Sequence, residues 1–189
     1  MTVLVVLLTV LAVALAAVGW FLTPAGPWRG AAAAALAGCL LTLGLVAVLH
    51  GPVGAGGGLH DALLVALFAV AVAGGGPVTA TVLRLADAGD NGRRRGAHAE
   101  AVLRGGAWIG AFERAAVFAA LVAGWPEGLA VVLALKGLGR YSELRSDAPA
   151  PGATPAAEGG GVAERYIIGT FASVLWAVAC AGAVAGLTR

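Results

Sequence analysis

The chain has few charged residues for its length. Only 12% of its 189 residues are Asp, Glu, Lys or Arg, and 60% are hydrophobic; a soluble domain has about 25% charged residues. So few polar side chains cannot cover a water-exposed surface, which excludes an ordinary soluble domain. Lipid is the expected solvent, and the length suits one membrane domain of roughly five to seven spans of about 20 residues.

Cysteine and the usual enzyme motifs are also scarce. Cys39 and Cys180 both lie in apolar runs, so we expect buried hydrophobic side chains rather than a disulfide or a metal pair. His50, His60 and Asp61 lie close in the sequence, but their spacing fits no metal motif. The sequence has no Ser-His-Asp set, Walker loop, CxxC or Rossmann fingerprint. It therefore predicts no metal, no cofactor and no nucleic-acid partner.

Lysine is nearly absent, since Lys136 is the only one beside 11 arginines. Together with the abundance of Ala and Gly, this bias indicates a bacterial protein with a high-GC genome, and hence the bacterial inner membrane. The segment Met1–Leu22 has no basic region before its apolar run. It also has no cleavage site followed by a soluble domain, so we expect a retained span rather than a signal peptide.

The apolar runs predict an all-α, polytopic membrane bundle with six transmembrane helices. These spans are residues 2–22, 30–49, 59–84, 106–124, 127–143 and 164–187. Gly74–Pro77 interrupts the third span, so Pro77–Asp87 is either a separate half-helix or part of a kinked span. Residues 146–163 are rich in Pro, Ala and Gly without periodicity, which predicts a disordered cytoplasmic linker.

The arginines predict the orientation in the membrane. With six spans, nearly all of them fall on one side, including Arg93-Arg94-Arg95 in the most polar loop, whereas the other side has only Arg189. Positively charged loops stay in the cytoplasm. Both termini are therefore predicted to lie outside the cytoplasm.

Several charges fall inside the last three predicted spans. A lone charge at the centre of a span costs about 2.5–3.5 kcal/mol on insertion, so we expect these side chains to face one another inside the bundle. They contain more cations than acids, which favours an anionic ligand. The residues predicted to bind it are Glu113, Arg114, Lys136, Arg140, Glu164 and Arg165.

The spacing of these charges predicts their partners. Lys136 and Arg140 are four residues apart and share a helix face. Glu113 is expected to pair with one of these two. The neighbouring Arg114 points about 100° away from Glu113, so we expect it to face lipid headgroups or an acid, Glu143 or Glu164. The alternative is a set of salt bridges that only holds the bundle together, with the arginines extending to the interface.

Other polar residues are secondary candidates. Asp87 and Asp90 could hold a divalent ion with a phosphate on Arg84, but the rest of the motif of membrane alcohol phosphotransferases is missing. A loop cap is the alternative. Thr170 and Ser173 could donate hydroxyl groups to a ligand, although the surrounding small residues are also typical of close helix packing.

The last part of the chain resembles a known family. Its pattern is G-x-x-I-G-x-x-E-R at Gly106–Arg114, K-x-x-x-R at Lys136–Arg140, and a sequence like E-[YF]-x-I-G-T at Glu164–Thr170. The pattern resembles the C-terminal membrane portion of an uncharacterised family of small bacterial polytopic membrane proteins. The resemblance covers residues 105–176, and it supports the site without implying an activity.

The sequence leaves three functions open. The cationic surplus favours transport or flipping of an anionic substrate, either a phosphate-bearing small molecule or a lipid. An integral membrane enzyme acting on a lipid phosphate would need Asp87 and Asp90 as its acids. A structural or assembly subunit would use the charges only as salt bridges. Membrane lipids are expected partners, and the Gly- and Ala-rich helix faces also permit a homo-oligomer.

Overall fold

The described part of the protein is entirely helical. The computed structural model describes residues 2–21, 28–52, 57–87, 106–146 and 160–188, and no strand occurs among them. The elements are α1 (Thr2–Phe21), α2 (Trp28–His50), α3 (Gly57–Ala69), the π-helix η1 (Val70–Gly74), α4 (Gly75–Ala86), α6 (Gly106–Val122), α7 (Glu127–Ser146) and α8 (Gly160–Thr188). The predicted all-α bundle is confirmed.

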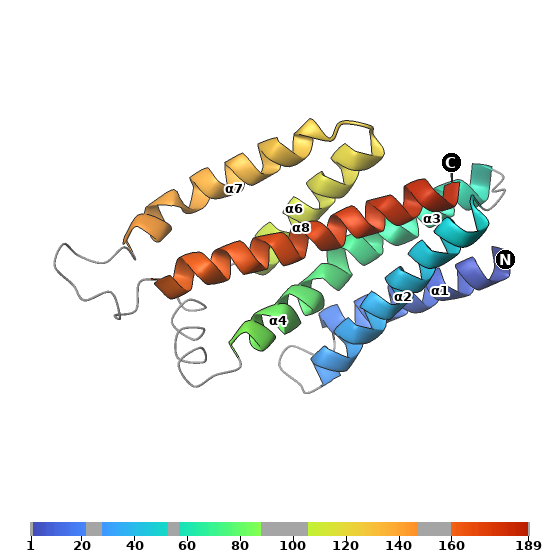
Figure 1. The fold of residues 1–189 in the computed structure, drawn as a ribbon, viewed down its shortest axis with the longest axis horizontal. Coiled ribbons are helices and arrows are strands. Elements are labelled where there is room, and N and C mark those ends of the chain that lie inside the picture. The colour runs from blue at the N-terminus through green and yellow to red at the C-terminus, as the bar shows by residue number, and fades with distance from the viewer. Residues whose placement is uncertain (1, 22–27, 53–56, 88–105, 147–159, 189) are drawn as a thin grey trace.

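The helices run side by side along the long axis of the molecule (Figure 1). The α1–α2 pair packs on one side, the α6–α7 hairpin lies on the other, and α8 lies between them against α2, α4 and α6. Both termini are at the same end (Figure 1). The end of α4, the end of α7 and the start of α8 lie toward the opposite end, which is where the charged side chains of these helices occur.

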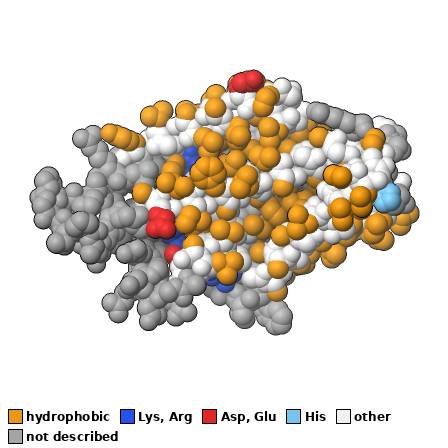
Figure 2. Space-filling view, in the orientation of Figure 1, with side chains coloured by type: hydrophobic (Ala, Val, Ile, Leu, Met, Phe, Trp, Pro, Cys, Tyr) orange, Lys and Arg blue, Asp and Glu red, His pale blue; other side chains and the backbone are white. Residues whose placement is uncertain are grey.

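Four helical stretches are long and apolar enough to cross a membrane: Thr2–Trp20, Gly30–His50, Gly57–Ala86 and Ala163–Thr188. Large hydrophobic side chains are exposed along several of them, and Figure 2 shows hydrophobic side chains over much of one face. Such a surface needs lipid around it, so the apolar helices indicate a membrane-embedded protein. The two other predicted spans correspond to α6 and α7. α6 is shorter, with 17 residues, and α7 is less apolar, with five charged residues.

The main hydrophobic core is formed by α1, α2, the α3–η1 segment and α8. Its largest fully buried side chains include Leu36, Leu43, Leu67 and Leu187. Phe118 of α6 extends into the same core. In contrast, α7 contributes no residue to this cluster among those described, and its apolar side chains touch only a smaller cluster around Val117.

The third span is continuous, so of the two alternatives for Pro77–Asp87 the structure has part of a single span and not a separate half-helix. The chain passes from α3 through η1 into α4, and both Gly74 and Gly75 have right-handed helical dihedrals. Pro77 has no N–H and its ring clashes with the preceding turn of a regular α-helix. A π-helical turn just before Pro77 widens the helix and absorbs this conflict without ending it.

The predicted linker is shorter than residues 146–163. α7 continues to Ser146 and α8 begins at Gly160, so both ends of the predicted linker are helical. Pro155 is the last proline before the final span, and the glycines that follow weaken a helix without preventing it. Residues 147–159 lie outside the described part of the chain.

Candidate functional site

Glu113 and Lys136 form an ion pair between α6 and α7. Lys136 Nζ donates to Glu113 Oε2, and the two side chains are 12% and 16% exposed, respectively. The Lys136 ammonium also lies 5.8 Å from the centroid of the Tyr166 ring on α8, within cation–π range. One cation thus connects three helices, and the pairing of Glu113 with Lys136 is as predicted.

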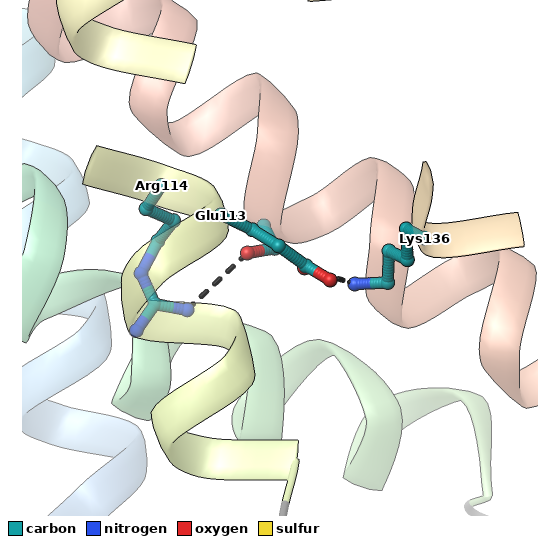
Figure 3. Close-up of polar contacts among 4 residues, drawn as sticks. Glu113, Arg114 and Lys136 are labelled. Atoms are coloured by element: carbon teal, nitrogen blue, oxygen red, sulfur yellow. Dashed lines mark hydrogen bonds and ion pairs between the residues drawn. The ribbon is translucent and has the colours of Figure 1, made fainter. Parts of the chain in front are cut away.

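Arg114 points into the bundle instead, and its side chain is buried. Its Nε and Nη2 atoms donate to the backbone carbonyl of Val72 at 3.0 and 2.8 Å, and Nη1 donates to Ser173 Oγ at 3.2 Å. Figure 3 shows the side chains of Glu113 and Arg114 leaving α6 in different directions. The prediction that Arg114 faces an acid or lipid headgroups is therefore wrong.

The π-helical register explains why Val72 needs Arg114. A π-helix pairs each carbonyl with the N–H five residues later, and for Val72 that residue is Pro77, which has no N–H. An unpaired carbonyl inside a bundle has a high free-energy cost in lipid. The fork of Arg114 supplies two N–H donors to this single oxygen, so the buried carbonyl has a donor even where the π-helical register offers it only Pro77.

Gly74 and Gly75 make room for the side chains that stabilise this segment. A Cβ atom on Gly75 would lie 2.3 Å from Cδ of Arg114, and one on Gly74 would lie 3.0 Å from the ring of Trp176. Trp176 Nε1 in turn donates to the carbonyl of Val70 at 3.1 Å. Because Gly74 and Gly75 have no Cβ atom, Arg114 of α6 and Trp176 of α8 can each place a donor against the backbone of η1.

A third polar contact lies at the junction of α4 and α8. Arg165 of α8 donates to Asp87 at the C-cap of α4, and this ion pair is partly buried. Arg84 is exposed and bonds to Thr81 of its own helix. Glu164 is exposed.

The predicted site residues therefore separate into three groups rather than one cationic pocket. The groups are Glu113 with Lys136, Arg114 with Ser173, and Asp87 with Arg165. Two of the groups meet α8 at neighbouring residues, Arg165 and Tyr166, and the third meets it about two turns later at Ser173, so α8 is the helix common to all three. Asp90 and the side chain of Arg140 lie outside the described residues, so their predicted roles stay predictions.

Side-chain types in the sequence do not reveal three of these contacts. The acceptors for Arg114 and Trp176 are backbone carbonyls, which leave no mark in a side-chain pattern. The third contact is the cation–π contact of Lys136 with the ring of Tyr166, which a pattern of charges does not include. The signal that could have located the Arg114 contact is the Gly-Gly-Gly-Pro run, because it marks a helix segment with an irregular backbone and room for a neighbour.

The geometry does not favour the acids needed by an enzyme. Asp87 is engaged by Arg165, and Asp90 is outside the described part of the chain. Among the described residues, no group of three or more His, Cys, Asp or Glu side chains is arranged to hold a metal ion. Lys136 contacts an acid, Glu113, on α6 and an aromatic ring, Tyr166, on α8. This arrangement allows the Lys136 ammonium group to exchange one partner for another.

Comparisons of the chain with known protein families, curated proteins and solved structures give no match.

Proposed function

We propose that this protein transports or flips an anionic, phosphate-bearing substrate, either a lipid or a small molecule, across the membrane. Lys136 exchanges Glu113 for the substrate during each cycle. The proposal rests on one observation above all: a mostly buried ion pair links α7 to the rest of an apolar bundle. A buried ion pair is seldom more stabilising than apolar side chains of the same size, so its presence supports a role beyond packing.

The packing of α7 supports its movement. α7 packs mainly on α6, and none of its described residues enters the main core. Its apolar contacts with the smaller cluster involve Leu129 and Val132, near the turn that joins it to α6. Lys136 lies about 10 Å beyond Leu129 and about 6 Å beyond Val132 along the helix, at 1.5 Å per residue. The part of α7 that holds Lys136 can therefore move away from Glu113 without unpacking the core.

The charges near this end of the bundle support an anion as substrate. When Glu113 leaves Lys136, an ammonium group is left in a mostly apolar environment, where an anionic group is the favourable replacement. Phosphate-bearing groups fit because they accept several charge-assisted hydrogen bonds. Arg165, one residue before Tyr166 on α8, already engages a carboxylate and provides a second cation.

Binding measurements on two variants test the exchange, because the account predicts opposite effects. Lys136→Met removes the cation, so retention of anionic lipid or inorganic phosphate by the purified protein should fall at least fivefold in native mass spectrometry. Glu113→Gln frees the ammonium group from its internal acid, so retention should rise. Leu138→Met, which changes an exposed side chain on the same helix as Lys136, serves as the control. Equal retention in wild type, Lys136→Met and Glu113→Gln would contradict the proposal.

A structural or assembly role is the second candidate, and one observation favours it. In the described part of the chain, Arg114, Lys136 and Arg165 each have a partner within the protein. If the ion pair only holds α7 in place, both single variants should lower the thermal stability without changing ligand retention. The exchanged pair Glu113→Lys with Lys136→Glu should then restore the stability of the wild type.

A further inference from the structure

Two threonines differ from the other helical threonines of the described chain. Thr9, Thr42, Thr81 and Thr188 each donate the hydroxyl group to the carbonyl four residues earlier, which is the usual arrangement in apolar helices. The hydroxyl oxygens of Thr79 and Thr170 are buried and have no hydrogen-bond partner among the described residues. Buried polar groups are nearly always paired, so this pair of exceptions requires an explanation.

Both threonines lie in the contact between α4 and α8. Gly169, the neighbour of Thr170, faces α4, because a Cβ atom added to Gly169 would lie 3.8 Å from Cγ2 of Thr79. Thr79 is one helical turn after Gly75, which touches Arg114, and two turns before Asp87. The two hydroxyl groups therefore lie on a stretch with an ion pair at one end and Arg114 at the other.

The polar residues of α8 follow the same line. Thr170 precedes Ser173 by one turn, so the two share a helix face, and Ser173 accepts a hydrogen bond from Arg114. Arg165 lies just over one turn before Thr170 and engages Asp87. The bonds of Arg114 to Val72 and Ser173 use three of its five N–H groups. Thr79 and Thr170 thus add hydroxyl groups on two packed helices, unpaired among the described residues, and Arg114 bonds to Ser173 one turn after Thr170.

We propose that Thr79 and Thr170 form a hydrated polar site between α4 and α8. Water occupies the site at rest, because it supplies the hydrogen-bond partners that the two buried hydroxyl groups lack among the described residues, and buried water is found beside such unsatisfied polar groups. During transport the site takes an oxygen atom of the phosphate-bearing substrate. This last step rests on the proposed function, whereas the hydration does not.

Cysteine labelling tests the site directly. Thr170→Cys and Val174→Cys are compared in a Cys39→Ala, Cys180→Ala background, with a small hydrophilic methanethiosulfonate reagent. Val174 is a matched control, because it is one turn further along α8 and equally buried, at 9% exposure against 8% for Thr170, but belongs to an apolar cluster. We expect Thr170→Cys to react at least tenfold faster. Equal rates at the two positions would overturn the hydrated site.

Two further measurements complete the test. Thr79→Cys is expected to react as fast as Thr170→Cys, so the comparison stands even if one variant does not fold. Thr170→Val should lower the thermal midpoint relative to Thr170→Ser if water occupies the site, and raise it if the site is dry, which would also overturn the proposal.

Ligand protection separates the inference from the proposed function. Inorganic phosphate or vesicles containing anionic phospholipid should slow the labelling of Thr170→Cys at least threefold. Fast labelling without any protection, in a protein that still retains phosphate or anionic lipid, would overturn the substrate step at this site. Fast labelling in a protein that retains neither ligand would leave the hydrated site supported and contradict the proposed function.

Discussion

At the scale of single residues, neighbours in the sequence have opposite roles. Glu113 and Arg114 are adjacent on α6, yet Glu113 reaches outward to α7 and Arg114 reaches inward to η1 (Figure 3). The inward group is 4% exposed and bonds to backbone, so its charge helps to hold one conformation. The outward group bonds to another side chain on a loosely packed helix, so its partner can change. Only the second arrangement suits substrate exchange.

Replacing Arg114 should therefore affect stability. Arg114→Met leaves the carbonyl of Val72 and the hydroxyl of Ser173 without their donor, and we expect a loss of about 2–3 kcal/mol in the free energy of unfolding. Arg114→Lys should recover less than half of this loss, because an ammonium group lacks the planar fork that donates twice to one oxygen. Thermal unfolding in detergent measures the effect.

The control for this prediction is Arg84→Met, since Arg84 is exposed and bonds only within its own helix. Its loss of stability should be small. If Arg114→Met unfolded at the same temperature as the wild type, the donor role assigned to Arg114 would be wrong.

The sequence predicts some of these contacts and not others, for a physical reason. The pairing of Glu113 with Lys136 follows from charge, depth and the antiparallel hairpin, all of which are visible in side-chain types. The role of Arg114 depends on a carbonyl freed by a local change of helix register. Hydropathy is high on both sides of that change, so apolar spacing predicts the span and misses the π-helical turn within it.

At the scale of elements, η1 and α4 depend on their neighbours. The Gly-Gly-Gly-Pro run is a poor helix former, and it remains helical because Arg114 and Trp176 donate to the carbonyls of Val72 and Val70. Sequence propensity alone predicts a break at this point. Packing from α6 and α8 overrides that propensity, which is why the segment forms one continuous helix with α3.

Gly75→Ala tests this dependence. The added methyl group would lie 2.3 Å from Cδ of Arg114, so either the arginine or the π-helical turn must move, at an expected cost of about 1–3 kcal/mol. Gly182→Ala in α8 is the matched control, because nothing lies within 4 Å of the added group. That change should leave the thermal midpoint unchanged or raise it. Similar midpoints for the two variants would contradict the account of the glycine run.

At the scale of the whole molecule, the bundle has two chemically different ends. The termini lie together at one end, and the ion pair of Asp87 with Arg165 lies toward the other (Figure 1). Arg84 and Arg165, the described arginines of α4 and α8, both belong to this second end. Anionic lipid and the positive-inside rule both favour the cytoplasm for such an end. The proposed exchange at Lys136 would therefore begin from the cytoplasmic half of the membrane.

Reporter fusions test this orientation. An epitope tag at the C-terminus should be reached by a membrane-impermeant reagent from outside the cytoplasm, and a tag at the N-terminus should give the same result. Tags that were accessible only from the cytoplasm would reverse the orientation. They would then place Lys136 in the opposite half of the bilayer.

Substrate flux in proteoliposomes tests the central claim most directly. The measurement follows uptake of radiolabelled phosphate and flipping of a fluorescent anionic phospholipid by wild type, Lys136→Met and Glu113→Gln, with the exposed-site variant Leu138→Met as the control. Because the cycle needs Lys136 to bind both the substrate and Glu113, each of the two variants should lose at least tenfold in rate while remaining folded. Flux equal to that of the wild type in both folded variants, or no flux of either substrate by the wild type, would contradict the account.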